Sequence, residues 1–478
     1  MAEKRLLFAA SEVFPFAKSG GLADVAYSLP KALSETFDVT VVMPLYRFID
    51  REAFGIVPVD EEFELAFGGA TYAVSLFESR YEGGRYLFVY APLLCDRDYL
   101  YGPPGEGYGD NALRFGLFCH AIVRLAESMA SDIVHLNDWQ SALAALLIAD
   151  GAPRQIQTVY TIHNLAYQGV FAKEAVAQLG IDPRRFTPDG VEFYGKLNLM
   201  KAGIGFADAV TTVSPTYAQE ILTPAFGCGL EGYLQVHGAK LSGIVNGIDI
   251  DHFSPATDGA LARPYTVPEG KAFNKARYLE EIGLDGAGKP LFIFIGRFTW
   301  QKGIDLLIDA LPSMAAQACN IAILGEGESA YRTRLERCAA GRENVHFMFG
   351  YDEPLAHRMY AAADFLLMPS LFEPCGLNQL IAMHYGALPI VHRVGGLVDT
   401  VHPLSACGDI RVGGCGIGFD APTETALLAA FDTALLLYGC SDDYRRLAAY
   451  NMKTDVSWRH SASAYADVYR KISERAVE

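Results

Sequence analysis

The sequence predicts an α/β protein built from two doubly wound domains in tandem. Short buried-strand patterns alternate with helical patterns along the chain, and the alternation restarts near its middle. At 478 residues the chain also exceeds the roughly 250–300 residues at which a single hydrophobic core stops growing. Two such domains would present the carboxyl ends of their sheets to a central cleft, where α/β folds bind ligands.

Residues 1–246 are expected to form the first domain. An apolar run at 6–10 predicts a buried strand, and a glycine-containing loop around Gly20 leads into a helical pattern at 22–32. Further strands are expected at 39–43, 133–136, 158–162 and 209–213, with a helix at 142–149. Their apolar character and their alternation with helices favour a mostly parallel sheet.

Residues 247–455 are expected to form the second domain, because the turn-forming pair Asn246-Gly247 interrupts the pattern. Strands are predicted at 291–295, 321–324, 345–349 and 365–368, and helices at 304–311 and 423–438. A last segment, residues 456–478, contains an amphipathic helix at 458–472. The second half therefore repeats the architecture of the first.

Composition and charge indicate an ordered protein that does not bind nucleic acid. Hydrophobic residues make up 51% of the chain and charged residues 20%. The formal net charge of −17 argues against phosphate-backbone binding, which needs a broad basic surface. A phosphorylated small molecule needs only a few converging basic groups, and these can be sought residue by residue.

The cysteines and the amino-terminal residues indicate in which cellular compartment the protein is expected. Nine cysteines are widely spaced without a Cys-x-x-Cys pair, so we expect reduced thiols and neither a disulfide framework nor a structural zinc site. The first apolar run is too short for a signal peptide, and no stretch approaches the ~20 apolar residues of a membrane span. We expect a cytoplasmic protein without a membrane partner.

The loop after the first predicted strand contains Lys18-Ser19-Gly20-Gly21. Glycines allow a ligand to approach the backbone closely, and Lys18 adds a cation at the edge of the sheet. The alternative is a tight turn with Lys18 in solvent. The loop is neither a Walker A loop nor a dinucleotide fingerprint, which disfavours nucleotide hydrolases and dehydrogenases.

The loop after the first strand of the second domain, Gly296-Arg297-Phe298-Thr299-Trp300-Gln301-Lys302-Gly303, carries two cations. A guanidinium and an ammonium can share two phosphate groups and offset the charge on a departing nucleoside diphosphate. The alternative is a solvated loop with Trp300 packed underneath.

A third candidate is the segment from Ser370 through Glu373 and Gly376 to Leu380, which enters a predicted helix. The first amides of a helix lack intrahelical partners and can bind an anion. Glu373 would repel phosphate and is better suited to accept hydrogen bonds from sugar hydroxyls. Its alternative role is a favourable charge near the start of the helix.

Polar side chains also end two strands of the first domain. His135 and Asp138 lie at the end of one strand, and His163 and Asn164 at the end of another. Such side chains at strand ends suit a polyol ligand. Each histidine alone could equally be a hydrogen-bonded core residue.

Five of these strings, in order, resemble motifs of bacterial glycogen synthases and plant starch synthases. They begin at Lys18, His163, Asn246, Gly296 and Glu373, and the resemblance covers the whole chain. It implies a GT-B fold of two Rossmann-like domains, with the last helix returning to the first domain. It also implies ADP-glucose as donor and an α-1,4-glucan such as glycogen as acceptor.

The resemblance implies roles for individual residues. Arg297 and Lys302 would hold the diphosphate, and Glu373 the glucose hydroxyls. The other implied substrate contacts are Cys375, the amides of Gly376 and Leu377 for the distal phosphate, Tyr351 stacked on the base, Lys18 with Gly20 and Gly21 from the first domain, and Asp138, His163 and Asn246 around the glucose and acceptor. By itself Tyr351 is only an exposed aromatic residue.

An α-linked donor and product require retention, yet no carboxylate stands out as a nucleophile. We therefore expect front-face attack, without cofactor or metal. The alternatives are a transferase that uses a UDP-sugar and a small acceptor, a phosphorylase with pyridoxal phosphate, and a catalytically silent carbohydrate-binding protein.

Overall fold

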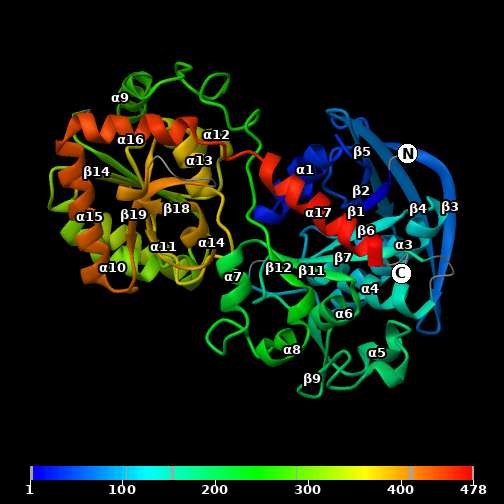
Figure 1. The fold of residues 1–478 in the computed structure, drawn as a ribbon. Helices are drawn as coiled ribbons and strands as arrows, with labels where there is room; N and C mark the ends of the chain where they lie inside the picture. Colours follow the sequence, from blue (N-terminus) through cyan, green and yellow to red (C-terminus); the bar gives the residue numbers. More distant parts are fainter. Residues whose placement is uncertain (1–3, 104, 152–154, 287, 408–412, 476–478) are drawn as a thin grey trace. The chain divides into compact units, whose positions relative to one another are not determined.

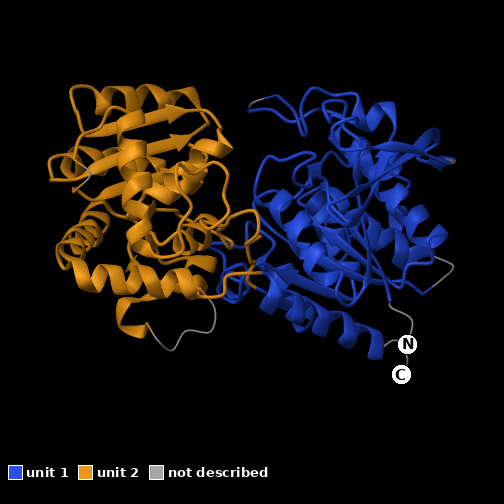
Figure 2. Cartoon of the chain, turned by 90° about the horizontal axis from the view of Figure 1, so that it is seen from above, with its two compact units in different colours: residues 1–244, 458–478 blue, residues 245–457 orange. Residues whose placement is uncertain are grey.

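A computed structural model describes residues 4–103, 105–151, 155–286, 288–407 and 413–475. The chain divides into two compact units, which Figure 2 distinguishes by colour. Unit 1 comprises residues 1–244 and 458–478, and unit 2 comprises residues 245–457. The sequence predicted divisions after residues 246 and 455, and the boundaries of the two units fall after residues 244 and 457.

Unit 1 is organised around a nine-stranded sheet in the order β12-β11-β7-β6-β1-β2-β5-β4-β3. Its strands are β1 (Arg5–Ala9), β2 (Asp38–Pro44), β3 (Val57–Phe67), β4 (Ala70–Tyr81), β5 (Gly84–Tyr90), β6 (Ile133–Asn137), β7 (Gln157–Ile162), β11 (Ala209–Thr212) and β12 (Leu241–Gly243). A small second sheet contains β8 (Val170–Phe171), β10 (Lys196–Asn198) and β9 (Glu192–Phe193).

The helices of unit 1 form two groups. One contains α1 (Gly21–Leu33) and α17 (Arg459–Arg475), which contact each other and lie side by side in Figure 1. The other contains α3 (Asn111–Ser128), α4 (Asp138–Gly151) and α6 (Leu199–Phe206). Short helices complete the unit: α2 (Pro92–Cys95), α5 (Ala175–Gln178), α7 (Pro215–Glu220), α8 (Glu231–Val236), η1 (Pro183–Arg185) and η2 (Gly238–Lys240).

The antiparallel strands at one edge of this sheet were not expected from the sequence. Strand β4 pairs antiparallel with both β3 and β5, and a turn at Gly68-Gly69, where both glycines have positive φ, joins β3 to β4. Many residues of β4 are exposed or half-buried. A search for buried apolar runs therefore misses this hairpin, and the two halves of the chain do not repeat each other completely.

The last helix, α17, belongs to unit 1. Its Tyr469 hydroxyl lies 2.7 Å from Nδ1 of His135, which is fully buried on β6. Nε2 of the same imidazole pairs with Thr161 Oγ1 at 2.6 Å. Burial, assisted by nearby His163, lowers the pKa of His135 to about 3. His135 is thus a neutral core residue that holds α17 on the sheet.

Unit 2 contains a seven-stranded parallel sheet in the order β15-β14-β13-β16-β17-β19-β18. Its strands are β13 (Leu291–Ile295), β14 (Asn320–Gly325), β15 (Val345–Phe349), β16 (Phe365–Met368), β17 (Leu388–His392), β18 (Val401–Pro403) and β19 (Gly414–Phe419). All four strands expected in this region are present.

Alternate residues of the strands in unit 2 enter two separate cores. Leu291 and Ile293 pack with residues of α9, α12 and α13, whereas Phe292 and Phe294 pack with residues of α10 and α15. Successive side chains of a strand point to opposite faces, so the sheet is covered by helices on both. The helices are α9 (Lys271–Glu281), α10 (Ile304–Ala315), α11 (Ser329–Ala339), α12 (Glu353–Ala362), α13 (Asn378–His384), α14 (Gly395–Thr400), α15 (Glu424–Gly439), α16 (Ser441–Lys453), η3 (Pro268–Gly270), η4 (Trp300–Lys302) and η5 (Leu404–Ala406).

The expectation that all cysteines are reduced is wrong at one place, because Cys407 and Cys415 form a disulfide. Their Cα atoms lie 6.0 Å apart, and their spacing in the sequence matches no familiar motif. Among the described residues, no helix has the length and apolar character to cross a membrane.

The attachment of α17 to unit 1 can be tested at Tyr469. Tyr469→Phe leaves Nδ1 of buried His135 without its partner, which should cost about 1–3 kcal/mol of unfolding free energy. Tyr469→Ala also removes a buried ring and should cost about 3–5 kcal/mol. Urea unfolding measures both losses, with the 80%-exposed Tyr194→Ala as control. Equal stability of all three variants would contradict this role.

Candidate active site

The candidate residues lie where parallel strands end at the switch points of the two sheets. In unit 1, β1 is flanked by β2 and β6, and in unit 2, β13 is flanked by β14 and β16. At such a point neighbouring connections leave in opposite directions, which opens a crevice beyond the carboxyl ends of the strands. The Lys18 loop and Asp138 follow β1 and β6, and the Arg297 loop and Glu373 follow β13 and β16.

In unit 2, the backbones of the loops after β13 and β16 pack closely together. Gly303 has φ +65°, and a Cβ at this position would lie 2.0 Å from the carbonyl oxygen of Pro369. The amide of Leu371 donates to the carbonyl of Gln301 at 2.9 Å. Only glycine fits at 303, so this position fixes the second cation, Lys302, beside the loop that carries Glu373.

Lys302 and Glu373 form an ion pair, with 2.6 Å between Nζ and Oε2. The side chain of Glu373 is 6% exposed and that of Lys302 is 21% exposed. Ser370 Oγ donates to the same carboxylate oxygen at 3.0 Å. A buried carboxylate needs such partners. Glu373 is therefore held by a cation and a hydroxyl, and its role is not limited to a favourable charge near the start of the helix.

Arg297 is exposed, and its guanidinium makes no hydrogen bond or ion pair with any residue that the structure describes. Trp300 is 61% exposed, so the alternative in which it packs beneath the loop is wrong. The loop therefore presents one cation without a protein partner and one paired with a carboxylate.

The segment after Glu373 is fixed by contacts that sequence reasoning missed. The amide of Gly396 donates to the carbonyl of Glu373 at 3.0 Å, and a Cβ on Gly396 would lie 2.4 Å from the Cα of Cys375. The glycine pair Gly395-Gly396 after strand β17 is the feature of the sequence that could have predicted this close approach of two backbones. The amides of Gly376 and Leu377, just before α13, donate to no group in the described part of the chain.

Asn246 lies in unit 2, whereas the sequence interpretation placed it at the end of the first domain. Its amide donates to Cys375 Sγ at 3.4 Å. Asn246 is buried, and its Oδ1 accepts no hydrogen bond from a described residue. Asn246 and Cys375 are therefore neighbours. Tyr351 is 61% exposed between β15 and α12.

In unit 1, the Lys18 loop is anchored by Glu12, a residue that the site prediction omitted. Glu12 is buried, and its carboxylate accepts hydrogen bonds from the amides of Ser19 at 2.5 Å and Gly20 at 3.2 Å. Lys18 forms an ion pair with Asp24 at 2.8 Å, with both side chains about a fifth exposed. The alternative of a fully solvated Lys18 is therefore wrong, and α1 begins at Gly21 in a fixed position.

Asp138 and His163 lie together at the ends of β6 and β7. Asp138 Oδ1 accepts from the amide of His163 at 2.7 Å, and Asp138 has φ +53°, in the left-handed region that aspartate tolerates better than most residue types. His163 Nε2 lies 2.8 Å from Oδ1 of Asn137, whose Nδ2 donates to the carbonyl of Ala9. Nε2 therefore carries the proton, and burial lowers the pKa of this imidazole to about 3.

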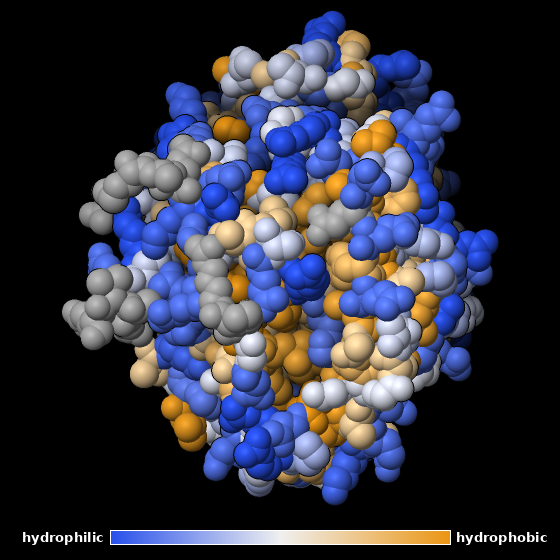
Figure 3. All heavy atoms as spheres, turned by 90° about the vertical axis from the view of Figure 1, so that its right-hand side faces the viewer, coloured by the Kyte–Doolittle hydropathy of each residue, from blue (hydrophilic) through white to orange (hydrophobic). Residues whose placement is uncertain are grey.

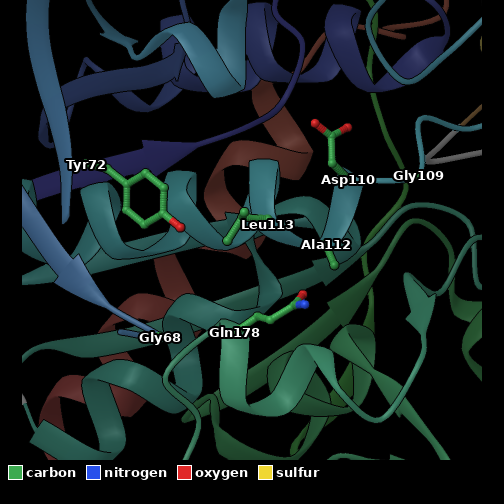
Figure 4. Close-up of a pocket in the computed structure, with 7 residues that line it drawn as sticks. All are labelled: Gly68, Tyr72, Gly109, Asp110, Ala112, Leu113 and Gln178. Carbon is green, nitrogen blue, oxygen red and sulfur yellow. The ribbon is translucent and has the colours of Figure 1, made fainter. Parts of the chain in front are cut away.

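A pocket of about 380 Å³ lies elsewhere in unit 1. Figure 4 shows Tyr72 of β4, Leu113 of α3 and Gln178 of α5 around it, and its other lining residues are Gly68, Gly109, Asp110 and Ala112. None of the sequence-predicted site residues lines this pocket.

Figure 3 shows one face of the molecule, where apolar side chains gather in a central hollow among hydrophilic ones.

Comparisons with known proteins cover both units. A family described as starch synthase catalytic domain matches residues 5–236, and one described as glycosyl transferases group 1 matches residues 280–453. Glycogen synthase 2 of Geobacter metallireducens is 41% identical over 482 residues, which covers 98% of this chain and 99% of that protein. The glycogen synthase of Thioalkalivibrio sulfidiphilus is 42% identical over 484 residues, with the same coverage.

Solved structures agree. The catalytic domain of starch synthase IV from Arabidopsis thaliana, bound to ADP and acarbose, matches with a TM-score of 0.91 and 31% identity over 99% of each chain. A sucrose-phosphate synthase from Thermosynechococcus elongatus matches with a TM-score of 0.64 and 18% identity, which bears on the fold alone. The predicted GT-B fold of two Rossmann-like domains is confirmed.

The environment of Asp138 makes a testable contribution to the pH dependence of stability. Burial raises its pKa to about 7, although the amides of His163 and Asn164 lower it. In the unfolded chain the carboxyl titrates at about 3.9. As pH rises from about 4 to about 7, the unfolded chain releases this proton before the folded protein does, and Asp138 increasingly destabilises the fold.

Asp138→Asn should therefore raise the melting temperature relative to wild type, by more at pH 8 than at pH 5. The contributions of other groups cancel in this difference. Asp98→Asn, at an exposed side chain, serves as the control and should show no such trend. A difference for Asp138→Asn that is equal at the two pH values would show that its carboxyl titrates normally.

Proposed function

This chain belongs to the glycogen and starch synthase family of glycosyltransferases, and we propose that it transfers glucose from ADP-glucose to the non-reducing end of an α-1,4-glucan with retention of configuration. The observation that carries the donor assignment is the ion pair of Lys302 with Glu373 beside the unpartnered Arg297. Cations suit a diphosphate and a carboxylate suits sugar hydroxyls, and one loop pair in unit 2 supplies both.

In this proposal the ammonium of Lys302 keeps one hydrogen bond to Glu373 and donates the others to the diphosphate. An ammonium has three donors, so the two contacts are compatible. Arg297 has no competing partner among the described residues and supplies a bidentate contact. The amides of Gly376 and Leu377 receive the distal phosphate, and their lack of acceptors among described groups supports this role.

The remaining donor contacts follow from the same arrangement. Exposed Tyr351 would stack on the adenine. Asn246 offers a buried carboxamide oxygen without a described donor, which suits a sugar hydroxyl. Cys375 supports Asn246 through its sulfur.

Residues of unit 1 serve the transferred glucose and the acceptor in this proposal. Lys18, Gly20 and Gly21 form a loop whose backbone is held by Glu12. Asp138 and His163 are fixed to each other. Because His163 is neutral, it can hydrogen-bond to a hydroxyl without introducing a positive charge.

The chemical step is front-face attack. The acceptor hydroxyl forms the new glycosidic bond on the side from which the diphosphate leaves, and the departing phosphate oxygen takes the hydroxyl proton. Negative charge grows on that oxygen as the old bond breaks, and Arg297 and Lys302 stabilise it. No metal or cofactor is used in this proposed step.

Donor choice tests the proposed function most simply. Glucose transfer to glycogen should have a higher kcat/KM with ADP-glucose than with UDP-glucose, and EDTA should leave the rate unchanged. The measurement is incorporation of labelled glucose from each donor side by side. A preference for UDP-glucose, or loss of transfer on chelation, would contradict the proposed donor or the metal-free step.

The two loop cations are tested through kcat. Arg297→Ala and Lys302→Ala should each lower kcat by about 10²–10³, because each removes a group that stabilises charge in the transition state. The double variant should lose less than the product of the single losses, since both groups act on one diphosphate.

The matched control is Arg332→Ala, at an exposed cation of the same unit that pairs with Glu336. It should leave kcat unchanged. Arg297→Ala and Arg332→Ala should keep the wild-type melting temperature within a few degrees, whereas Lys302→Ala should lower it, because it leaves the buried Glu373 carboxylate without its cation. A folded Arg297→Ala or Lys302→Ala variant with normal kcat would restore the interpretation of a solvated loop.

A further inference from the structure

A cluster of His252, Glu353 and His357 in unit 2 takes no part in the proposed reaction. Each side chain offers one potential ligand atom, and these atoms lie within 4.8 Å of one another. Glu353 and His357 are four residues apart on α12 and therefore share one face of the helix. His252 comes from the loop that follows Asn246.

The orientation of His357 leaves one ring nitrogen available. Its Nδ1 lies 2.7 Å from Oδ2 of Asp258, which also accepts a hydrogen bond from the hydroxyl of Tyr385 at 2.6 Å. The side chain of His357 is 7% exposed, and its Nε2 is buried with no hydrogen-bond partner in the described structure. An Nε2 proton would be buried without an acceptor, so we assign the proton to Nδ1 and a lone pair to Nε2.

A histidine that donates through one nitrogen to a carboxylate and offers the other to a ligand is the usual arrangement of a metal-binding imidazole. The carboxylate fixes the tautomer and makes the second nitrogen more basic. Phe253 further fixes the rings, since it stacks on His357 with centroids 4.9 Å apart and meets His252 edge-on at 4.7 Å.

The spacing fits a small transition-metal ion. His252 Nε2 and Glu353 Oε1 are 3.5 Å apart, and a tetrahedral Zn²⁺ with bonds of about 2.0–2.1 Å holds its ligand atoms about 3.3 Å apart. The side chains of His252 and Glu353 are 34% and 28% exposed, so the cluster lies near the surface, although Nε2 of both histidines is itself buried. Two imidazoles and one carboxylate form a ligand set that zinc accepts, with water in the fourth position.

We infer that His252, Glu353 and His357 form a binding site for a divalent transition-metal ion such as Zn²⁺, with Asp258 as the outer partner of His357. The bound ion joins the loop after Asn246 to the first turn of α12 and stabilises unit 2. The competing interpretation is a simple His252–Glu353 ion pair beside a core histidine.

The probe is Zn²⁺ alone, added to the full chain after removal of metals by EDTA and dialysis. The exposed thiols of Cys228 and Cys440 could also bind zinc, so the experiment uses a Cys228→Ser, Cys440→Ser background. Calorimetry should show one bound ion per chain, and zinc should raise the melting temperature. Absence of stoichiometric binding in this background would overturn the inference.

Ligand variants identify the site. His252→Ala and Glu353→Gln, both at partly exposed positions, should keep the metal-free melting temperature but bind zinc at least 10-fold more weakly. His346→Ala, a half-buried histidine of the same unit outside the cluster, should bind like the background protein. Visible absorption of bound Co²⁺ should follow the same pattern. Zinc affinity equal to that of the background protein in both ligand variants would overturn the proposed metal site. This outcome does not depend on the assays with ADP-glucose and UDP-glucose, so it is separate from a failure of the proposed function.

Discussion

The ion pair between Lys302 and Glu373 is the interaction on which the donor side of this protein depends. Lys302 follows β13 and Glu373 follows β16, and the two loops meet because these strands are parallel neighbours that end at the same edge. A buried carboxylate without a partner would be costly. The Lys302 ammonium and the Ser370 hydroxyl offset the cost of burying the Glu373 carboxylate, and the close packing at Gly303 keeps Lys302 in place.

Unit 1 also fixes its loops with carboxylates, but these accept hydrogen bonds from backbone amides. Glu12, just after β1, holds the amides of Ser19 and Gly20, and Asp138, at the end of β6, holds that of His163. In each case a carboxylate fixes a separate stretch of backbone near the ends of the strands.

The sequence predicted the parts of the fold that depend on continuous apolar runs. Strands β13 and β16 begin and end where expected, because both faces of the parallel sheet are buried there. The β3–β4 hairpin was missed because its exposed face breaks that pattern. Helix α16 and the Cys407–Cys415 disulfide were also missed, since neither carries a distinctive local motif.

For the candidate site, motifs predicted which residues matter but not how they are held. No local pattern reveals that Glu12 anchors the Lys18 loop or that Asn137 orients His163, because these contacts join segments that only the folded sheet brings together. The His252 cluster was missed for the same reason, since His252 and α12 are far apart in the sequence.

The most direct test of the central claim is a crystal structure of the protein with ADP. The account predicts that phosphate oxygens lie within hydrogen-bonding distance of the Arg297 guanidinium and the Lys302 ammonium, with the distal phosphate at the amides of Gly376 and Leu377. Lys302 should still contact Glu373. A diphosphate bound away from both cations, with Arg297 in solvent, would contradict the account.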